Sequence, residues 1–456
     1  MKVNSHFPLR AHYHNNVTVP SALKTNGVSY LKLDPPELID INKVRVVLQK
    51  IPTLRSAGID VWIGTGSAHE TDSALRGISH FNEHIVFKGT KTRSNLDILH
   101  QTEGLGGYLN AFTGEEYTCY YTVSLGEFSH LSLEVLLDMV QNPKLDESDI
   151  ETEKKVIIQE IKKDKDTSTI RVLELANEIM FGTHPYGIDI AGNVKTVKSF
   201  NADILRKRLS ELYTPQNTVV SVSGNFDMDA IASTIEKMIS PQRADGVEYV
   251  VPPVHYNSGI AIENRKDSKQ ANIVLATQGI SLYDSDKYVL KMIDIALGSG
   301  MISRLSQEIR EKRGLAYTVD TINDNRRLGG MFGVYVGCNH DKALEVVSLI
   351  LKEFNDLKKN GLNPKEFERT KGQLRSQLLR KADSTEEIAH DNGHNRLYFN
   401  NLVSLEEAEH QKVEKITNEE IISVANKIFG PTSYVLAIVG KESKLPKEDK
   451  FNFTKE

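Results

Sequence analysis

The stretch GISHFNEHIVFKG (77–89) contains the most informative pattern in this 456-residue sequence. It predicts a helix that ends near Gly89, because glycine commonly follows the last helical turn. His80 and His84 are four residues apart, so they lie on one face of the helix, where both imidazoles can reach the same metal ion. Glu83 lies beside that face and is predicted to activate a water molecule rather than to bind the metal. The order His-x-x-Glu-His is the reverse of the better-known zinc-binding His-Glu-x-x-His.

A second helical segment, SDIETEKKVIIQEIKKD (148–164), contains the predicted third ligand. Glu160 lies between Ile157 and Ile161 on the apolar side of this helix, where burying a carboxylate is costly unless it is paired or bound to a metal. Two histidines and one glutamate with an open fourth position are typical of a catalytic zinc site. Glu153 lies two turns before Glu160 and is predicted to orient one of the histidines.

Composition and charge exclude several other classes of protein. The sequence is 39% hydrophobic and 26% charged, with a formal net charge of −5, so no overall basic field would attract nucleic acid. No stretch reaches the roughly 18 apolar residues of a membrane-spanning helix. The two cysteines, Cys119 and Cys338, are far apart in the sequence. Neither a disulfide framework nor a cysteine zinc site is therefore predicted, and a reducing compartment fits.

The length predicts at least two domains, and the hydrophobic pattern predicts that they are similar. Three pairs of segments resemble each other: 58–66 with 271–280, 217–226 with 432–441, and 145–160 with 362–377. Gln377 takes the place of Glu160 in the second copy, so metal chemistry is expected in the first half only. The predicted divisions are an N-terminal extension (1–41), a zinc-bearing catalytic half (42–240), a linker (241–258) and a substrate-binding half without metal (259–456). An unrelated second domain is the alternative.

From about Asn42 to about Lys441 the sequence resembles the pitrilysin family of inverzincins, and in particular the branch of mitochondrial processing peptidase and its bacterial relatives. The motif at 77–89 is similar to the family signature, with Asn82 where leucine is common. The family's glutamate ligand follows the second histidine by about 76 residues, as Glu160 follows His84 (160 − 84 = 76). Further similar segments are GGYLNAFTGEEYTCYY (106–121), HPYG (184–187) and SRLSQEIREKRGLAY (303–317).

The resemblance implies an α+β fold, with two similar α/β sandwich halves, helices on mainly antiparallel sheets, that enclose a peptide-binding chamber. It implies one Zn²⁺ per active site and an endopeptidase acting on extended peptides, with leader or presequence removal and general oligopeptide degradation both open. Asn110 and Ala111 are expected on an edge strand that binds substrate through its backbone. Arg310 and Tyr317 are expected to hold substrate, and Tyr317 to act in catalysis near the developing oxyanion.

Two other functions remain open on the sequence: a non-catalytic partner subunit of a processing-peptidase-like heterodimer, and a metal-binding module that docks peptides without cleaving them. The complete set of metal-site residues argues against the first. HDNGH (390–394) also has histidines four residues apart, but Gly393 replaces the glutamate. The family implies a homodimer or a heterodimer with an inactive relative. A cytoplasmic location is expected, or the mitochondrial matrix if residues 1–41 are a transit segment.

Overall fold

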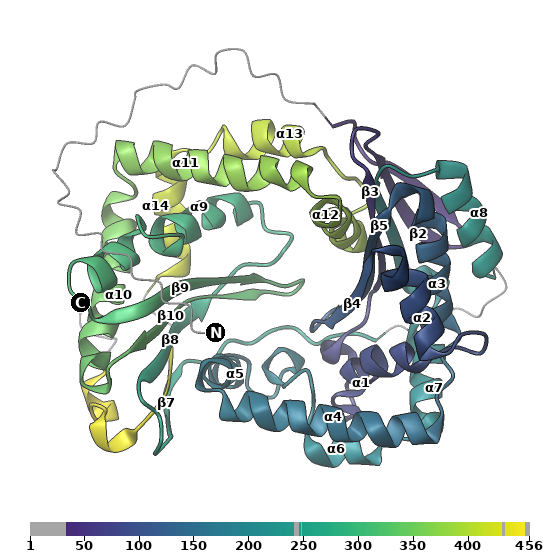
Figure 1. Ribbon diagram of the computed structural model, residues 1–456. Coiled ribbons are helices and arrows are strands. Elements are labelled where there is room, and N and C mark those ends of the chain that lie inside the picture. Colours follow the sequence, from purple (N-terminus) through teal and green to yellow (C-terminus); the bar gives the residue numbers. More distant parts are fainter. Residues whose placement is uncertain (1–32, 241–245, 248, 431–433, 452–456) are drawn as a thin grey trace, which may run out of the picture. The chain divides into compact units, whose positions relative to one another are not determined.

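The computed structural model describes residues 33–240, 246–247, 249–430 and 434–451 (Figure 1). Most of the predicted extension and part of the predicted linker lie outside these residues. The strands are β1 (Glu37–Ile41), β2 (Val44–Lys50), β3 (Ser56–Ile63), β4 (Tyr108–Thr113), β5 (Thr118–Leu125), β6 (Thr218–Gly224), β7 (Gly259–Asn264), β8 (Ala271–Gln278), β9 (Ala316–Asn325), β10 (Gly330–Cys338) and β11 (Val435–Gly440).

The strands form two sheets that share a five-strand topology, to which β1 adds a sixth strand in the first sheet. The first sheet has the order β1-β2-β6-β3-β5-β4 and the second β7-β11-β8-β10-β9. In the first sheet β2 and β6 are parallel and the following pairs are antiparallel; β7 and β11 are likewise parallel, and their following pairs are antiparallel. Each predicted strand correspondence, β3 with β8 and β6 with β11, matches this order. The predicted α+β class with two similar halves is confirmed.

The helices are α1 (Ile78–Ile85), α2 (Asn95–Thr102), α3 (Ser129–Gln141), α4 (Glu147–Asp166), α5 (Ser168–Phe181), α6 (Val194–Ser199), α7 (Ala202–Leu212), α8 (Met228–Met238), α9 (Lys287–Gly298), α10 (Ala343–Asn360), α11 (Pro364–Leu379), α12 (Thr385–Tyr398), α13 (Leu405–Ala408) and α14 (Asn418–Ile428). In the described part of the chain, none combines the length and the apolar character that crossing a membrane requires.

The two halves exchange one helix each. Alternate side chains of β3 point to opposite faces of the first sheet. One face packs in a core with α1 and α3, whereas the other carries Trp62 and Cys119 and is covered by α12 from the C-terminal half (Figure 1). In the same way α5, from the N-terminal half, packs on β8 and β11 of the second sheet. Each sheet therefore needs a helix from the other half to bury its second face.

The predicted N-terminal extension (1–41) is too long at its C-terminal end. Residues 37–41 form β1, which pairs antiparallel with β2 across a two-residue turn at Asn42 and Lys43. Both turn residues have positive φ, 50° and 71°, as the tight hairpin turns that match strand twist require. The short stretch ELIDI was too brief to indicate a strand until its partner was known.

Candidate metal centre

Helix α1 carries the predicted ligands because its two faces differ. Ile78, Phe81 and Ile85 are buried in the core against the first sheet, which turns the histidine side of the helix away from it. Gly77 precedes the first residue of the helix as its N-cap; its φ of 90° suits glycine, and its missing side chain leaves room for the carbonyl of Ala191. These constraints fix the direction in which His80 and His84 point.

Three side chains converge at this helix. Glu160 Oε2 of α4 lies 3.8 Å from His80 Nε2 and 3.6 Å from His84 Nε2. One ligand atom from each residue lies within 4.8 Å of the other two. These separations are too long for hydrogen bonds and close to the ~3.4 Å between ligands that are each about 2.1 Å from one tetrahedral ion. The donor set, two imidazole nitrogens and one carboxylate oxygen, is that of a catalytic zinc site.

The protonation states also fit a cation at this point. Burial, followed by the neighbouring His84, lowers the pKa of His80 to about 4, so its imidazole is neutral at pH 7 and has a lone pair for a metal. Burial alone would lower the pKa of His84, but its hydrogen bond to Glu153 and the charges of Glu83 and Glu160 raise it. A bound zinc ion would neutralise the negative charge of the same carboxylates, in place of the proton that they favour on His84.

The two glutamates of α4 differ from the prediction in their burial. Glu160 was expected on the buried side of the helix, but its side chain is 40% exposed, because it faces a cavity rather than the core. Glu153 is the buried one, 3% exposed, with Oε2 3.1 Å from His84 Nδ1 and an ion pair from Oε1 to Lys88. This contact leaves His84 Nε2 directed at the convergence point, and the orienting role of Glu153 stays a prediction.

Glu83 does not share the convergence point, and its carboxylate is held from another element. Thr113, at the end of β4, donates a 2.5 Å hydrogen bond from its hydroxyl to Glu83 Oε2. Burial raises the pKa of Glu83, while the bond to Thr113 opposes the rise. A carboxylate with a raised pKa and a fixed orientation is suited to accept and return a proton.

A cavity of about 400 Å³ lies next to the three converging residues and is acidic. His80, Glu83 and Glu160 line it together with Ala111 and Thr113 of β4. The other acidic lining residues are Glu115, Asp164, Glu174, Glu178 and Asp189. None of the described residues that line it is lysine or arginine. Its surface is therefore complementary to a cationic group.

The predicted substrate-binding residues lie in two places. Asn110 and Ala111 are in the middle of β4, which among the described strands pairs with β5 alone and so leaves its other edge open. Arg310 and Tyr317 are in the second half, where the guanidinium lies 5.2 Å from the ring centroid of Tyr317. Tyr317 is 82% exposed, and neither residue is among those that line the acidic cavity. Their contact with substrate stays a prediction.

Sequence reasoning missed Thr113, Lys88 and most of the acidic cavity. A signal for Thr113 was present, because Ala111 and Thr113 share one face of a strand whose first residues were already assigned to substrate binding. Asp164 lies four residues after Glu160 on the same helix and could have been found in the same way. Asp189 comes from a loop after α5, and no spacing in the sequence indicates it.

Comparison with known proteins identifies the family of this chain. Residues 45–194 match the family model described as insulinase (peptidase family M16), and residues 199–374 match the peptidase M16 inactive domain. An uncharacterized zinc protease of Bacillus subtilis, YmxG, is 34% identical over 405 residues, which cover 89% of this chain and 98% of that protein. The chain belongs to the M16 peptidase family.

A second relative of this M16 chain supports the same family, and solved structures of lower identity share its fold. An uncharacterized zinc protease of Rickettsia bellii is 33% identical over 402 residues, 88% of this chain and 96% of its own length. Among solved structures, the peptidase M16 inactive domain from Pseudomonas fluorescens has a TM-score of 0.81 at 19% identity, covering 89% of this chain and 97% of that one. A protease from Helicobacter pylori has a TM-score of 0.79 at 20% identity, covering 89% and 99%. At the family level the predicted resemblance is confirmed.

Proposed function

We propose that this M16 chain is a zinc-dependent endopeptidase that cleaves peptides bound in an extended conformation. The observation that carries the proposal is the convergence of His80, His84 and Glu160 within 4.8 Å, beside a separate carboxylate held for proton transfer. Its relatives named as zinc proteases support the choice of metal. Within the family, we propose the processing-peptidase-like branch, which its resembling segments imply.

In this mechanism each residue has one task. His80, His84 and Glu160 would hold zinc, which when bound supplies Lewis-acid activation of water and of a peptide carbonyl. Glu83 accepts the proton of the attacking water and returns it to the leaving amine. Thr113 keeps the Glu83 carboxylate in one orientation through its 2.5 Å hydrogen bond. The substrate adds as a strand to the open edge of β4 next to Asn110 and Ala111, which brings its backbone to the cavity.

Replacing Glu83 by glutamine tests the mechanism. We expect Glu83→Gln to retain zinc, because Glu83 is not a ligand, and to lose between about a hundredfold and ten-thousandfold in turnover of a quenched peptide. His84→Ala is the matched variant, expected to lose both metal and turnover. A zinc-loaded Glu83→Gln protein that keeps more than about a tenth of the wild-type rate would contradict the role of Glu83. Full metal occupancy without turnover in the wild-type protein would favour the non-catalytic alternative.

The acidic cavity supports a preference for peptides with a basic side chain near the cleaved bond. Arg171 balances part of the charge of Glu174 and Glu178, whereas Asp164 and Asp189 face the cavity without a lysine or arginine among its lining residues. Two peptides that differ only in arginine against citrulline, which has the same shape without the charge, test this. A kcat/KM at least about tenfold higher for arginine is expected, corresponding to ~1.4 kcal/mol. Equal kcat/KM values for the two peptides would mean that the acidic cavity does not select substrates by charge.

A further inference from the structure

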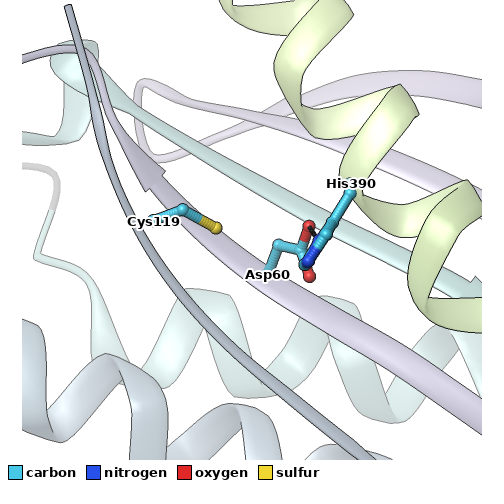
Figure 2. Close-up of side chains that lie close together, drawn as sticks. All are labelled: Asp60, Cys119 and His390. Atoms are coloured by element: carbon cyan, nitrogen blue, oxygen red, sulfur yellow. Dashed lines mark hydrogen bonds and ion pairs between the residues drawn. The ribbon is translucent and has the colours of Figure 1, made fainter. Parts of the chain in front are cut away.

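A second group of metal-ligating side chains lies on the opposite face of the first sheet. Asp60 of β3 and Cys119 of β5 point to the face that α12 covers, and His390 of α12 lies over them. Figure 2 shows the sulfur of Cys119 directed toward the Asp60 carboxylate, with His390 beside it. One ligand atom of each residue lies within 4.8 Å of the other two. The mechanism proposed above uses none of the three.

The Asp60 carboxylate is only half satisfied. Its Oδ2 accepts a hydrogen bond from Trp62 Nε1 (3.0 Å) and lies 2.6 Å from His390 Nδ1. Its Oδ1 is buried and has no hydrogen-bond partner among the described residues, although the residue is only 1% exposed. Leaving a buried carboxylate oxygen unpaired costs about 1–3 kcal/mol or more. A cation beside Oδ1 would remove that cost.

We propose that Asp60, Cys119 and His390 form a second metal site, for a divalent cation of the zinc class. Carboxylate, thiolate and imidazole together are a donor set that zinc and cobalt accept. The ion would bind Asp60 through Oδ1, so the bond from Trp62 to Oδ2 remains. It would bind His390 through Nδ1, whose hydrogen bond to Asp60 would break. In the present structure the other ring nitrogen, Nε2, lies 3.8 Å from Glu386 Oε1, so Glu386 is available to orient the ring.

Charge balances in this exchange. The starting state is taken as an ionised Asp60 paired with a protonated His390, with Cys119 as a neutral thiol. The entering ion brings two positive charges, while Cys119 loses its thiol proton and His390 its ring proton, so two protons leave to solvent and the site is neutral before and after. The side chain of His390 is 27% exposed, which provides a route for the ion and for both protons. Cys119 itself is fully buried.

A metal here would link the two halves of the chain. Asp60 and Cys119 belong to the first sheet, whereas His390 belongs to the helix that the C-terminal half places on it. The Phe112 ring of β4 lies 5.8 Å from the ring of His390, so the ion would also stiffen the neighbourhood of the proposed substrate-binding strand. The site is therefore structural in character and separate from the metal centre on α1.

Cobalt binding tests the proposal without measuring activity. The full chain is stripped of metal with a chelator and titrated with Co²⁺, and a thiolate-to-cobalt charge-transfer band in the near ultraviolet is recorded. The centre on α1 contains no sulfur, so this band reports only a cysteine site, whether or not the peptidase function holds. We expect the band in the wild-type protein and in Cys338→Ser, the matched control at the other buried cysteine. We expect Cys119→Ser to lose it.

The His390→Gln variant keeps the test decisive if Cys119→Ser does not fold, because residue 390 is on the partly exposed surface of α12. Loss of groups that merely orient ligands costs about 10–100-fold in metal affinity, so loss of a ligand should weaken cobalt binding by more than about a hundredfold. A wild-type protein without the band at saturating Co²⁺ would overturn the proposal. So would a band that survives in folded Cys119→Ser, or unchanged affinity in His390→Gln.

Discussion

At the scale of single residues, Glu153 and Glu160 show how one helix gives two carboxylates different tasks. Both point to the histidines of α1, but Glu153 is 3% exposed and bonded to His84 Nδ1, whereas Glu160 is 40% exposed and faces both Nε2 atoms. Against its burial, the hydrogen bonds to His84 and Lys88 lower the pKa of Glu153, so it stays ionised at neutral pH. An ionised, buried acceptor holds the imidazole in one tautomer and one orientation.

Glu153→Gln should therefore weaken zinc binding without removing a ligand. We expect the zinc dissociation constant to rise by about 10–100-fold, because His84 loses its orienting carboxylate. The control is Glu151→Gln on the same helix, whose side chain is 61% exposed and pairs only with Lys154 in the described structure. Competition with a chromophoric chelator measures both constants. Equal affinity in the two variants would show that Glu153 does not act through His84.

Asn82, on helix α1, is a polar residue buried without hydrogen bonds from its side chain in the described structure. It stands where leucine is common in the resembling family, is 1% exposed, and neither its Nδ2 nor its Oδ1 has a hydrogen-bond partner among the described residues. Asn82→Leu should raise the free energy of unfolding by about 1–3 kcal/mol, since it removes a buried unsatisfied amide. Asn392→Leu is the contrasting control. The buried Asn392 donates a 2.6 Å hydrogen bond to Gln49, so this variant should have a lower free energy of unfolding. Urea denaturation measures the free energy of unfolding of both variants. A lower value for Asn82→Leu than for the wild-type protein would contradict the expected gain.

At the scale of elements, α12 shows how a helix with a weak amphipathic pattern packs closely on a sheet. The motif HDNGH (390–394) lies on α12, and a side chain at Gly393 would collide with the Trp62 indole and approach Ser221. Glycine thus permits the close approach that also brings His390 to Asp60. Position 393, where a metal centre of the α1 type would need glutamate, is therefore glycine because the packing of the helix on the sheet leaves no room for a side chain.

Gly393→Ala should separate α12 from the sheet. We expect the protein to lose about 1–3 kcal/mol of stability through overpacking. Gly372→Ala in α11 is the matched change, because a Cβ there meets nothing within 4 Å and should add about 0.5–1 kcal/mol through helix propensity. Chemical denaturation of both proteins measures the difference. A neutral Gly393→Ala would mean that α12 packs less closely than described.

At the scale of the whole molecule, buried charge joins the two halves close to the cavity. Arg326, in the turn between β9 and β10, is 5% exposed and lies 2.9 Å from Glu115, in the turn between β4 and β5. Its guanidinium also donates to the carbonyl of Tyr186 at 3.1 Å. Beside it, Glu116 accepts hydrogen bonds from Tyr186 and from Tyr398 of α12. Two turns and one exchanged helix therefore meet in a single polar cluster.

Removing Arg326 should loosen this junction. Arg326→Met keeps most of the side-chain volume but leaves Glu115 without its cation, and the expected loss is about 3 kcal/mol. Arg313→Met is the control, since Arg313 is 36% exposed and its pair with Glu308 should matter by less than about 1 kcal/mol. Thermal unfolding followed by circular dichroism compares them. Equal losses would indicate that the buried cluster contributes no more than a surface pair.

The local sequence was sufficient to propose the three metal-site residues, which the fold brings together, and to predict most elements. His80, Glu83 and His84 share one helical turn, and Glu160 follows at a family spacing, so periodicity and resemblance together predicted a metal centre and the strand correspondence between the halves. Folding alone decided which residues from distant segments surround that centre. Thr113 reaches Glu83, Asp189 reaches the cavity, and His390 reaches Asp60 only because strand pairing and the exchange of α5 and α12 close chain loops of up to 330 residues. Such contacts have no periodicity along the chain, since they are set by packing between elements and not by the rise of any one helix or strand.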